Sequence, residues 1–305
     1  MNNDYYSKYW LPINISTHGD TIDSLITVLH YFMAVLFVGW FIYLVYVLIR
    51  FRESANPKAQ LDVKHFKLPT YLEVGIVLVE AALLVFVSQP LWAKVKNEFP
   101  AEADALVVRV VAEQFAWNTH YPGRDGKFGE TRIDLIDTTN PVGLDRESQY
   151  GLDDIVTINS FHVPVNKPVI VHLSSKDVIH SFALPVARVK QDAIPGMTIP
   201  VWFEVTQTGE FEVACAQLCG NGHYRMRGAF IVDSAEDFEA FIQEEYEYLA
   251  EDMEEGFLEK VSGKSTSSAD ETSAEEQPVE QEQTAEPVEE NSEDTSEAAD
   301  QEKEE

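Results

Sequence analysis

Two long apolar runs near the start of the chain constrain its fold more than any other feature of the sequence. Residues 24–49 contain 26 residues without Asp, Glu, Lys or Arg, and residues 74–92 contain 19 residues with one charge, Glu80. A helix of about 20 apolar residues crosses the hydrocarbon core of a bilayer. We therefore predict two membrane-spanning helices within residues 24–92. The first run is too long for a cleavable signal peptide, and no basic segment precedes it.

The charges that flank these runs predict how the chain crosses the membrane. The connecting loop, residues 50–69, carries five Lys or Arg against two acidic residues, whereas residues 1–23 carry one Lys and three Asp. Short loops rich in Lys and Arg remain in the cytoplasm. We therefore expect the loop in the cytoplasm, and both the extracytoplasmic segment 1–23 and everything after residue 92 on the outer side.

Short runs of β-branched or aromatic residues, separated by Gly, Pro, Asn and Asp, recur through residues 93–250. These runs lie at 106–112, 155–158, 168–173, 198–205, 209–214 and 228–232. Strands of this length and spacing favour a sandwich or a Greek-key barrel. A short amphipathic helix is expected at 235–249. The predicted fold class is thus an α+β membrane protein, in which a two-helix transmembrane hairpin precedes a Greek-key β-sandwich.

The end of the chain differs from the rest in composition. Residues 251–305 hold 21 Asp or Glu against 3 Lys, a net charge of −18 out of −30 for the whole chain. A segment rich in Ser, Thr, Glu and Gln, with almost no aromatic residues, cannot bury enough apolar surface to offset its chain entropy. We therefore expect a disordered acidic tail.

The two cysteines of the chain, Cys215 and Cys219, lie with His223 and Met226 within the twelve residues 215–226. Thiolate, imidazole and thioether are the ligands that select copper, and His180 upstream is a fifth candidate. A disulfide is one alternative, but it would close a tiny loop and constrain the unfolded chain little. Zinc is another, because Cys-x3-Cys-x3-His has ligand-like spacing. Since zinc rarely takes a thioether, the pattern favours copper.

Three stretches of the chain resemble subunit II of the haem–copper cytochrome c oxidases, namely residues 177–182, 190–196 and 215–226. The likeness extends from about residue 20 to residue 235. It implies a cupredoxin-like sandwich that carries CuA, a centre of two copper ions bridged by two cysteines. The ligands that the resemblance implies are His180, Cys215, the main-chain carbonyl of Gln217, Cys219, His223 and Met226.

The resemblance also implies the activity and the partners. Subunit II accepts electrons from a c-type cytochrome and passes them to the haem-bearing subunit I, which reduces oxygen to water in a proton-translocating complex. The expected location is a bacterial-type inner (plasma) membrane, with the copper domain and the C-terminus on the periplasmic side. The oxygen chemistry belongs to another subunit, because this sequence has no Cys-x-x-Cys-His haem motif. We expect no nucleic-acid partner.

Further residues match positions near the copper site of the family. Phe115, Trp117 and Tyr121 align with the aromatic patch through which electrons enter, although Phe115 stands where many members have tryptophan. A strand tryptophan is more often a core residue, which is the alternative for Trp117. Asp177 matches a position where the cytochrome docks. Other acidic candidates for docking lie in the loop-rich segment 122–154, namely Asp145, Asp153 and Asp154.

Two glutamates and one glutamine complete the comparison. Glu73 matches a glutamate at the mouth of a proton-uptake route, and Glu80, seven residues later, lies near the same helix face. Polar packing between helices is the alternative role for both. Gln217 stands where the family most often has a glutamate whose side chain helps to bind magnesium at the border with the catalytic subunit. Because an amide is a weaker ligand for a hard cation, we expect that magnesium site to be weakened or absent.

Two other classes of protein have the same general pattern. One is a stand-alone, membrane-anchored module that binds copper or zinc and has no oxidase partner. The other is a subunit of the quinol-oxidase type with a purely structural sandwich. The complete ligand set from His180 to Met226 argues against this second class, because a quinol-oxidase subunit has no need of copper.

Overall fold

The computed structural model describes residues 11–55 and 67–252. Residues 1–10, 56–66 and 253–305 lie outside the described residues. The disordered acidic tail, most of the cytoplasmic loop and the first part of the extracytoplasmic segment therefore stay predictions.

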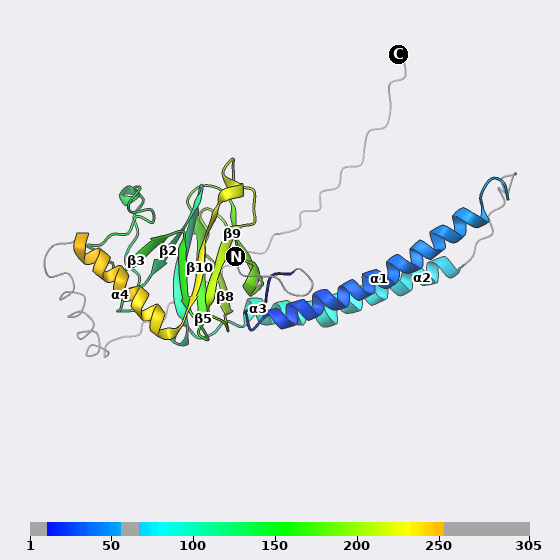
Figure 1. Cartoon of the computed structure of the whole chain (residues 1–305), viewed down its shortest axis with the longest axis horizontal. Coiled ribbons are helices and arrows are strands. Elements are labelled where there is room, and N and C mark those ends of the chain that lie inside the picture. Colours follow the sequence, from blue (N-terminus) through cyan, green and yellow to red (C-terminus); the bar gives the residue numbers. More distant parts are fainter. Residues whose placement is uncertain (1–10, 56–66, 253–305) are drawn as a thin grey trace, which may run out of the picture. The chain divides into compact units, whose positions relative to one another are not determined.

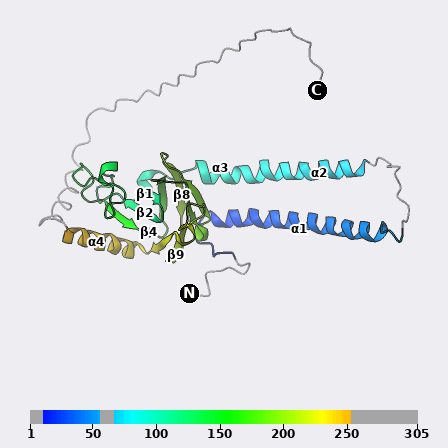
Figure 2. The same cartoon turned by 90° about the horizontal axis from the view of Figure 1, so that it is seen from above.

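Both apolar runs form long helices. The first is α1 (Gly19–Arg50), and the second is a continuous helical segment of α2 (Leu68–Leu83), a π-helical turn η1 (Leu84–Ser88) and α3 (Gln89–Asn97). Each is long and apolar enough to cross a membrane. Figures 1 and 2 show α1 and α2 running alongside one another. Their apolar side chains are largely exposed in the isolated chain, as expected of surfaces that contact lipid or another subunit.

The π-helical turn has a local cause in the sequence. Pro90 has no amide hydrogen, and its ring clashes with the carbonyl four residues earlier in a regular α-helix. Residues 84–88, which end two positions before this proline, form a π-helical turn, in which each hydrogen bond spans five residues instead of four. The helix continues through α3 after the irregular turn instead of ending there.

The rest of the described chain is a sandwich of two five-stranded sheets (Figure 1). The strands are β1 (Leu106–Glu113), β2 (Ala116–Tyr121), β3 (Ile155–Ile158), β4 (Ser160–Pro164), β5 (Pro168–Ser175), β6 (His180–Leu184), β7 (Val189–Ala193), β8 (Ile199–Glu204), β9 (Gly209–Cys215) and β10 (Arg227–Asp233). One sheet has the order β3-β2-β1-β5-β8 and the other β4-β10-β9-β6-β7. The pairs β1–β5 and β4–β10 are parallel, and the remaining pairs are antiparallel.

The predicted fold class is confirmed, and all six predicted runs are strands. Sequence patterns missed β2, β4, β6 and β7. These strands carry Asn, His, Ser or Lys at positions where an isolated pattern predicts a loop, and several of those polar residues are buried by neighbouring strands that come from distant parts of the sequence. The predicted helix at 235–249 is present as α4 (Ala235–Asp252).

Aromatic rings fill the space between the two sheets. Phe161, Phe182, Phe203 and Phe230 are fully buried, and their ring centroids lie 5.5–6.4 Å apart in edge-to-face or stacked pairs. Trp117 packs edge-on against Phe182 at 5.5 Å. Each such ring contributes about 1.5–3 kcal/mol through burial. This core gives the loops at the ends of the sandwich a rigid base.

The segment between β2 and β3 buries two of the acidic residues that the sequence suggested for docking. Asp154 has no exposed surface and accepts hydrogen bonds from the ring of His120 at 2.6 Å and the amide of Gly129 at 2.7 Å. Asp153 is 3 % exposed and accepts the amide of Arg124 at 2.7 Å. A docking role for Asp153 and Asp154 is therefore wrong, because neither carboxylate reaches the surface. Both instead hold the turns of this segment together.

Polar contacts tie the start of α1 to the sandwich. The guanidinium of Arg188 donates to both carboxylate oxygens of Asp23 at 2.8 and 2.9 Å, and to the carbonyl of Pro12 at 2.8 Å. Ser16 forms an isolated β-bridge with Val205. Two-point pairing with a planar guanidinium fixes direction as well as distance. The first helix is thus attached to the sandwich through side chains as well as through the backbone after α3.

Candidate metal centre

The predicted ligands converge where β6, β9 and β10 meet. Cys215 ends β9, and the loop that follows it (yellow in Figure 1) leads into β10. Phe182 of β6 pairs with Cys215, which brings His180, at the start of β6, beside the cysteine loop. The amide of Cys215 donates to the carbonyl of Met226 at 3.1 Å and closes the base of the loop. Strand pairing therefore joins residues that are 35 positions apart in the sequence.

All six predicted ligands place a donor atom within 3.9 Å of a cysteine sulfur. The two sulfur atoms are 3.8 Å apart, and both cysteines are free. The Cys215 sulfur is neighboured by Nδ1 of His180 at 3.9 Å and the carbonyl oxygen of Gln217 at 3.1 Å. The Cys219 sulfur is neighboured by Nδ1 of His223 at 3.6 Å and the sulfur of Met226 at 3.7 Å. This donor set suits a soft metal such as copper.

Asp177 fixes the orientation of the buried ring of His180. Nε2 of His180 lies 2.8 Å from one carboxylate oxygen of Asp177, which leaves Nδ1 directed at the Cys215 sulfur. The amides of Val178 and Gln114 donate to the same carboxylate at 2.6 and 2.7 Å. Burial opposes ionisation, but these hydrogen bonds outweigh it and hold the pKa of Asp177 below its ordinary value. A carboxylate of this kind fixes the tautomer of a metal-binding histidine.

Burial and a bound metal act in opposite directions on the ionisation of the Cys219 thiol. Burial, followed by the neighbouring thiol of Cys215, raises the pKa of Cys219 to about 11. Without a cation, the protein therefore disfavours a negative charge on Cys219. A bound metal reverses this preference, because a coordinating thiol loses its proton. A bound cation would thus offset the burial that disfavours a negative charge on Cys219.

Two glycines let the loop approach the turn between β1 and β2. A Cβ atom on Gly222 would lie 2.4 Å from the ring of Phe115, so a larger residue cannot fit there. Gly220 has φ of 140°, a backbone conformation that side chains disfavour. The side-chain amide of Gln114 donates to the carbonyl of Cys219 at 2.6 Å. Sequence reasoning missed Gln114 as a support of the loop, because nothing local to it indicates a partner 105 residues away.

The three predicted aromatic residues lie in different surroundings. Phe115 is half-buried against Gly222, and Trp117 is buried with its ring 6.2 Å from that of His180. Tyr121 is also buried, but it packs against Phe241 of α4 and its hydroxyl donates to the carbonyl of His162. The structure thus brings Phe115 and Trp117 to the cysteine loop and places Tyr121 away from it.

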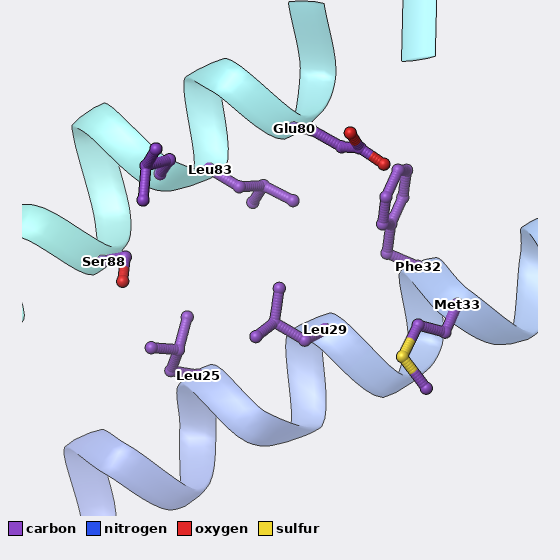
Figure 3. Close-up of a pocket in the computed structure, with 8 residues that line it drawn as sticks. Leu25, Leu29, Phe32, Met33, Glu80, Leu83 and Ser88 are labelled. Carbon is purple, nitrogen blue, oxygen red and sulfur yellow. The ribbon is translucent and has the colours of Figure 1, made fainter. Parts of the chain in front are cut away.

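Glu73 and Glu80 both lie on α2. Glu80 lines an apolar cavity of about 340 Å³ between the two long helices, together with Leu29, Phe32 and Met33 (Figure 3). Figure 3 shows the Glu80 carboxylate directed toward the ring of Phe32. Glu73 lies about two helical turns earlier on the same helix and is exposed in the isolated chain.

Comparison with known proteins places this architecture in a family. Residues 106–234 match the family model described as cytochrome c oxidase subunit II, periplasmic domain. The alternative cytochrome c oxidase subunit 2 of Bradyrhizobium diazoefficiens is 34 % identical over 246 residues, covering 78 % of this chain and 84 % of that protein. The cytochrome c oxidase subunit 2 of Cereibacter sphaeroides is 32 % identical over 213 residues, covering 66 % and 68 %.

Among solved structures, the periplasmic domain of subunit II of the Bradyrhizobium japonicum cytochrome oxidase is similar. It is 31 % identical, covers 50 % of this chain and 99 % of that chain, and has a TM-score of 0.37.

The fold and the site together define a class of protein, a sandwich domain with a soft-metal site that follows two membrane helices. Within that class, the chain belongs to the cytochrome c oxidase subunit II family. It is a subunit of cytochrome c oxidase, part of a haem–copper oxidase complex, and the subunit through which electrons enter that oxidase. The resemblance stated from the sequence is confirmed.

Replacement of Asp177 tests its role in holding His180. In Asp177→Asn the side-chain NH2 would face either the amide of Gln114, or both the ring of His180 and the amide of Val178, so at least one hydrogen bond is lost and the ring is held less firmly. We expect copper affinity to fall about 10–100-fold, as is typical for such supporting residues. The measurement is a competition titration of the full-length chain in detergent against a copper chelator. Asp134→Asn, at an exposed ion pair with Arg132, is the control. Equal affinities for both variants would contradict a positioning role.

Proposed function

We propose that this subunit carries a CuA centre of two copper ions, held by His180, Cys215, the carbonyl of Gln217, Cys219, His223 and Met226. The observation that carries the proposal is the convergence of these donors within 3.9 Å of the cysteine sulfur atoms. The donors outnumber what one tetrahedral ion needs, and two thiolates can be shared between two metals. By analogy with the family, one copper would add His180 and Met226, and the other His223 and the Gln217 carbonyl.

The protein would serve this centre mainly by keeping its ligands still. Copper bound there would accept one electron at a time and pass it on. The ring of His180 is fully buried and tied to Asp177, and Met226 is 2 % exposed. The cysteine loop and the strands on either side of it are supported by the aromatic core between the two sheets. Because the ligands cannot move far, little rearrangement would accompany each change of charge.

The partners and the location of the chain follow from the same proposal. The electron donor would be a c-type cytochrome, and the acceptor the haem-bearing subunit I. The positively charged segment 50–69 supports a hairpin, residues 24–92, whose loop lies in the cytoplasm of a bacterial-type cell. The sandwich domain, residues 93–250, and the acidic tail after it would then lie on the periplasmic side of the inner membrane.

Copper content tests the number of ions. The full-length chain, refolded with copper in detergent, should bind two coppers per chain and show intense sulfur-to-copper absorption. Cys215→Ser and Cys219→Ser should each abolish that absorption, because in the proposed centre each sulfur would be shared by both ions. Gln217→Ala is the matched control in the same loop: its main-chain carbonyl remains, so both coppers should stay. One copper per chain, or tight zinc binding in its place, would refute the dinuclear centre.

The side chain of Gln217 bears on the magnesium ion expected from the resemblance. Gln217 is exposed, and its neutral amide is a weaker ligand than a carboxylate for a hard divalent cation. We propose that magnesium at the border with subunit I binds weakly or is absent, and that Gln217→Glu strengthens it. Metal analysis of the purified complex is the measurement. Stoichiometric magnesium bound tightly to the wild-type complex through Gln217 would contradict this proposal.

We also propose that Glu73 takes part in proton uptake. Glu73→Gln should slow oxygen consumption by the assembled complex, while reduction of the copper centre by the donor stays unchanged, because the residue lies on α2 and not in the sandwich. Glu80→Gln, seven residues along the same helix, is the comparison and should have a smaller effect. Equal turnover of the Glu73→Gln and wild-type complexes would leave Glu73 with a packing role only.

A further inference from the structure

The sheet β3-β2-β1-β5-β8 carries a cavity of about 580 Å³ on its outer face, away from the aromatic core. Successive residues of a strand point to opposite faces of a sheet. Val108 and Val110 of β1 belong to the core, so Arg109 between them faces outward. His172 of β5 alternates with core residues in the same way. Strand pairing sets Arg109 beside His172, and both side chains line the cavity.

An aromatic ring fixes the guanidinium of Arg109 at the cavity wall. The central carbon of the guanidinium lies 4.1 Å from the centre of the Phe128 ring. That ring packs edge-on against His120, with 5.1 Å between the ring centres, and His120 is bound to the buried Asp154. Stacking occupies the flat face of a guanidinium and leaves the N–H groups of its edge for a ligand. The orientation of Arg109 is therefore set before any ligand arrives.

The charge of Arg109 has no partner in contact with it. Within the described part of the chain, its guanidinium forms neither an ion pair nor a hydrogen bond. Asp154 is the nearby acid, but its oxygens already accept hydrogen bonds from His120, Gly123 and Gly129. Burial lowers the pKa of Arg109 even with Asp154 close by. In a chain with 52 acidic and 22 basic residues, a half-buried, unpaired arginine is unexpected unless an external anion pairs with it.

Hydroxyl groups and apolar side chains complete the lining, from Thr131, Ser174, Thr198, Val107 and Val111. Pockets for small organic molecules have volumes of about 300–1,000 Å³ and combine apolar walls with a few polar groups. A simple inorganic ion would leave most of this cavity unfilled. The size and the lining therefore favour an organic anion with an apolar body.

We propose that the cavity binds a small organic carboxylate, whose two oxygens pair with the edge of the Arg109 guanidinium and whose apolar body lies against Val107 and Phe128. A planar guanidinium and a carboxylate match in two parallel hydrogen bonds. Arg109 is the one permanent cation of the lining, and Glu102 opposes it at the exposed mouth, so a monoanion fits better than a doubly charged phosphate. The site is separate from the copper ligands, which lie on and beside strands of the other sheet.

His172 makes the binding depend on pH. Burial is the largest influence and lowers the pKa of His172; Glu102 opposes this effect and Arg109 adds to it. A bound carboxylate would raise that pKa, because a negative charge favours the protonated ring. Binding then takes up a proton, so the affinity should increase several-fold as the pH falls from about 8 to about 5.5. His172→Gln should remove this dependence.

The experiment measures binding of benzoate from the broadening of its proton NMR signals, with the full-length chain in detergent and with the assembled oxidase. Arg109→Gln should weaken binding at least about tenfold, and Arg109→Lys, which keeps the charge but loses the planar fork, should weaken it less. Glu102→Gln should strengthen binding about threefold, because it removes a repelling charge. Lys167→Gln, which removes an exposed positive charge between β4 and β5, is the matched control and should bind as wild type does.

Two further probes separate the contributions of charge and apolar surface. Benzamide has the ring without the charge, and acetate has the charge without the ring. Each should bind at least about tenfold more weakly than benzoate. Detergent micelles without protein give the blank.

Three results would overturn the proposal. One is equal affinity of Arg109→Gln, Lys167→Gln and the wild type for benzoate, with circular dichroism spectra that show all three folded. Another is equal affinity of the wild type for benzoate and benzamide. The third is binding to the isolated chain but not to the assembled oxidase, which would mean that another subunit covers the cavity. The copper content should be the same in all these variants, so failure of this proposal is distinguishable from failure of the proposed function.

Discussion

The close approach of two sulfur atoms, 3.8 Å apart and unbonded, is the constraint on which the site depends. Two neighbouring thiolates repel each other, and burial adds to the cost of charging them. The fold holds them together by hydrogen bonds: the amide of Cys215 donates to the carbonyl of Met226, and the side-chain amide of Gln114 donates to the carbonyl of Cys219. A metal cation removes the repulsion, so the geometry that is costly for the empty loop becomes favourable for a copper-bound one.

Acidic and apolar side chains near the metal site differ from expectation in their exposure to solvent. The carboxylate of Asp177 accepts a hydrogen bond from His180 although its side chain is 30 % exposed, and apolar side chains such as Leu218 and Tyr224 are exposed to solvent. Two of the three acidic groups expected at the surface of the β2–β3 segment, Asp153 and Asp154, are buried, whereas Asp145 is partly exposed. More than half of the net negative charge of the chain thus belongs to residues 251–305.

The sequence predicted the features whose causes are local. A run of apolar residues is by itself sufficient for a membrane helix, and two cysteines, a histidine and a methionine in one loop form a recognisable ligand set. The strands β2 and β6 and the support by Gln114 were missed because their causes are distant in the sequence. Whether a carboxylate such as Asp154 is buried depends on the strands around it, which composition does not show.

Electron paramagnetic resonance of the copper-loaded, full-length chain tests the central claim most directly, because it reports how many metal nuclei share one unpaired electron. A pair of coppers joined by Cys215 and Cys219 predicts a hyperfine pattern from two equivalent copper nuclei. A pattern from a single copper nucleus, or no signal from a chain that binds its metal as zinc, would contradict the account.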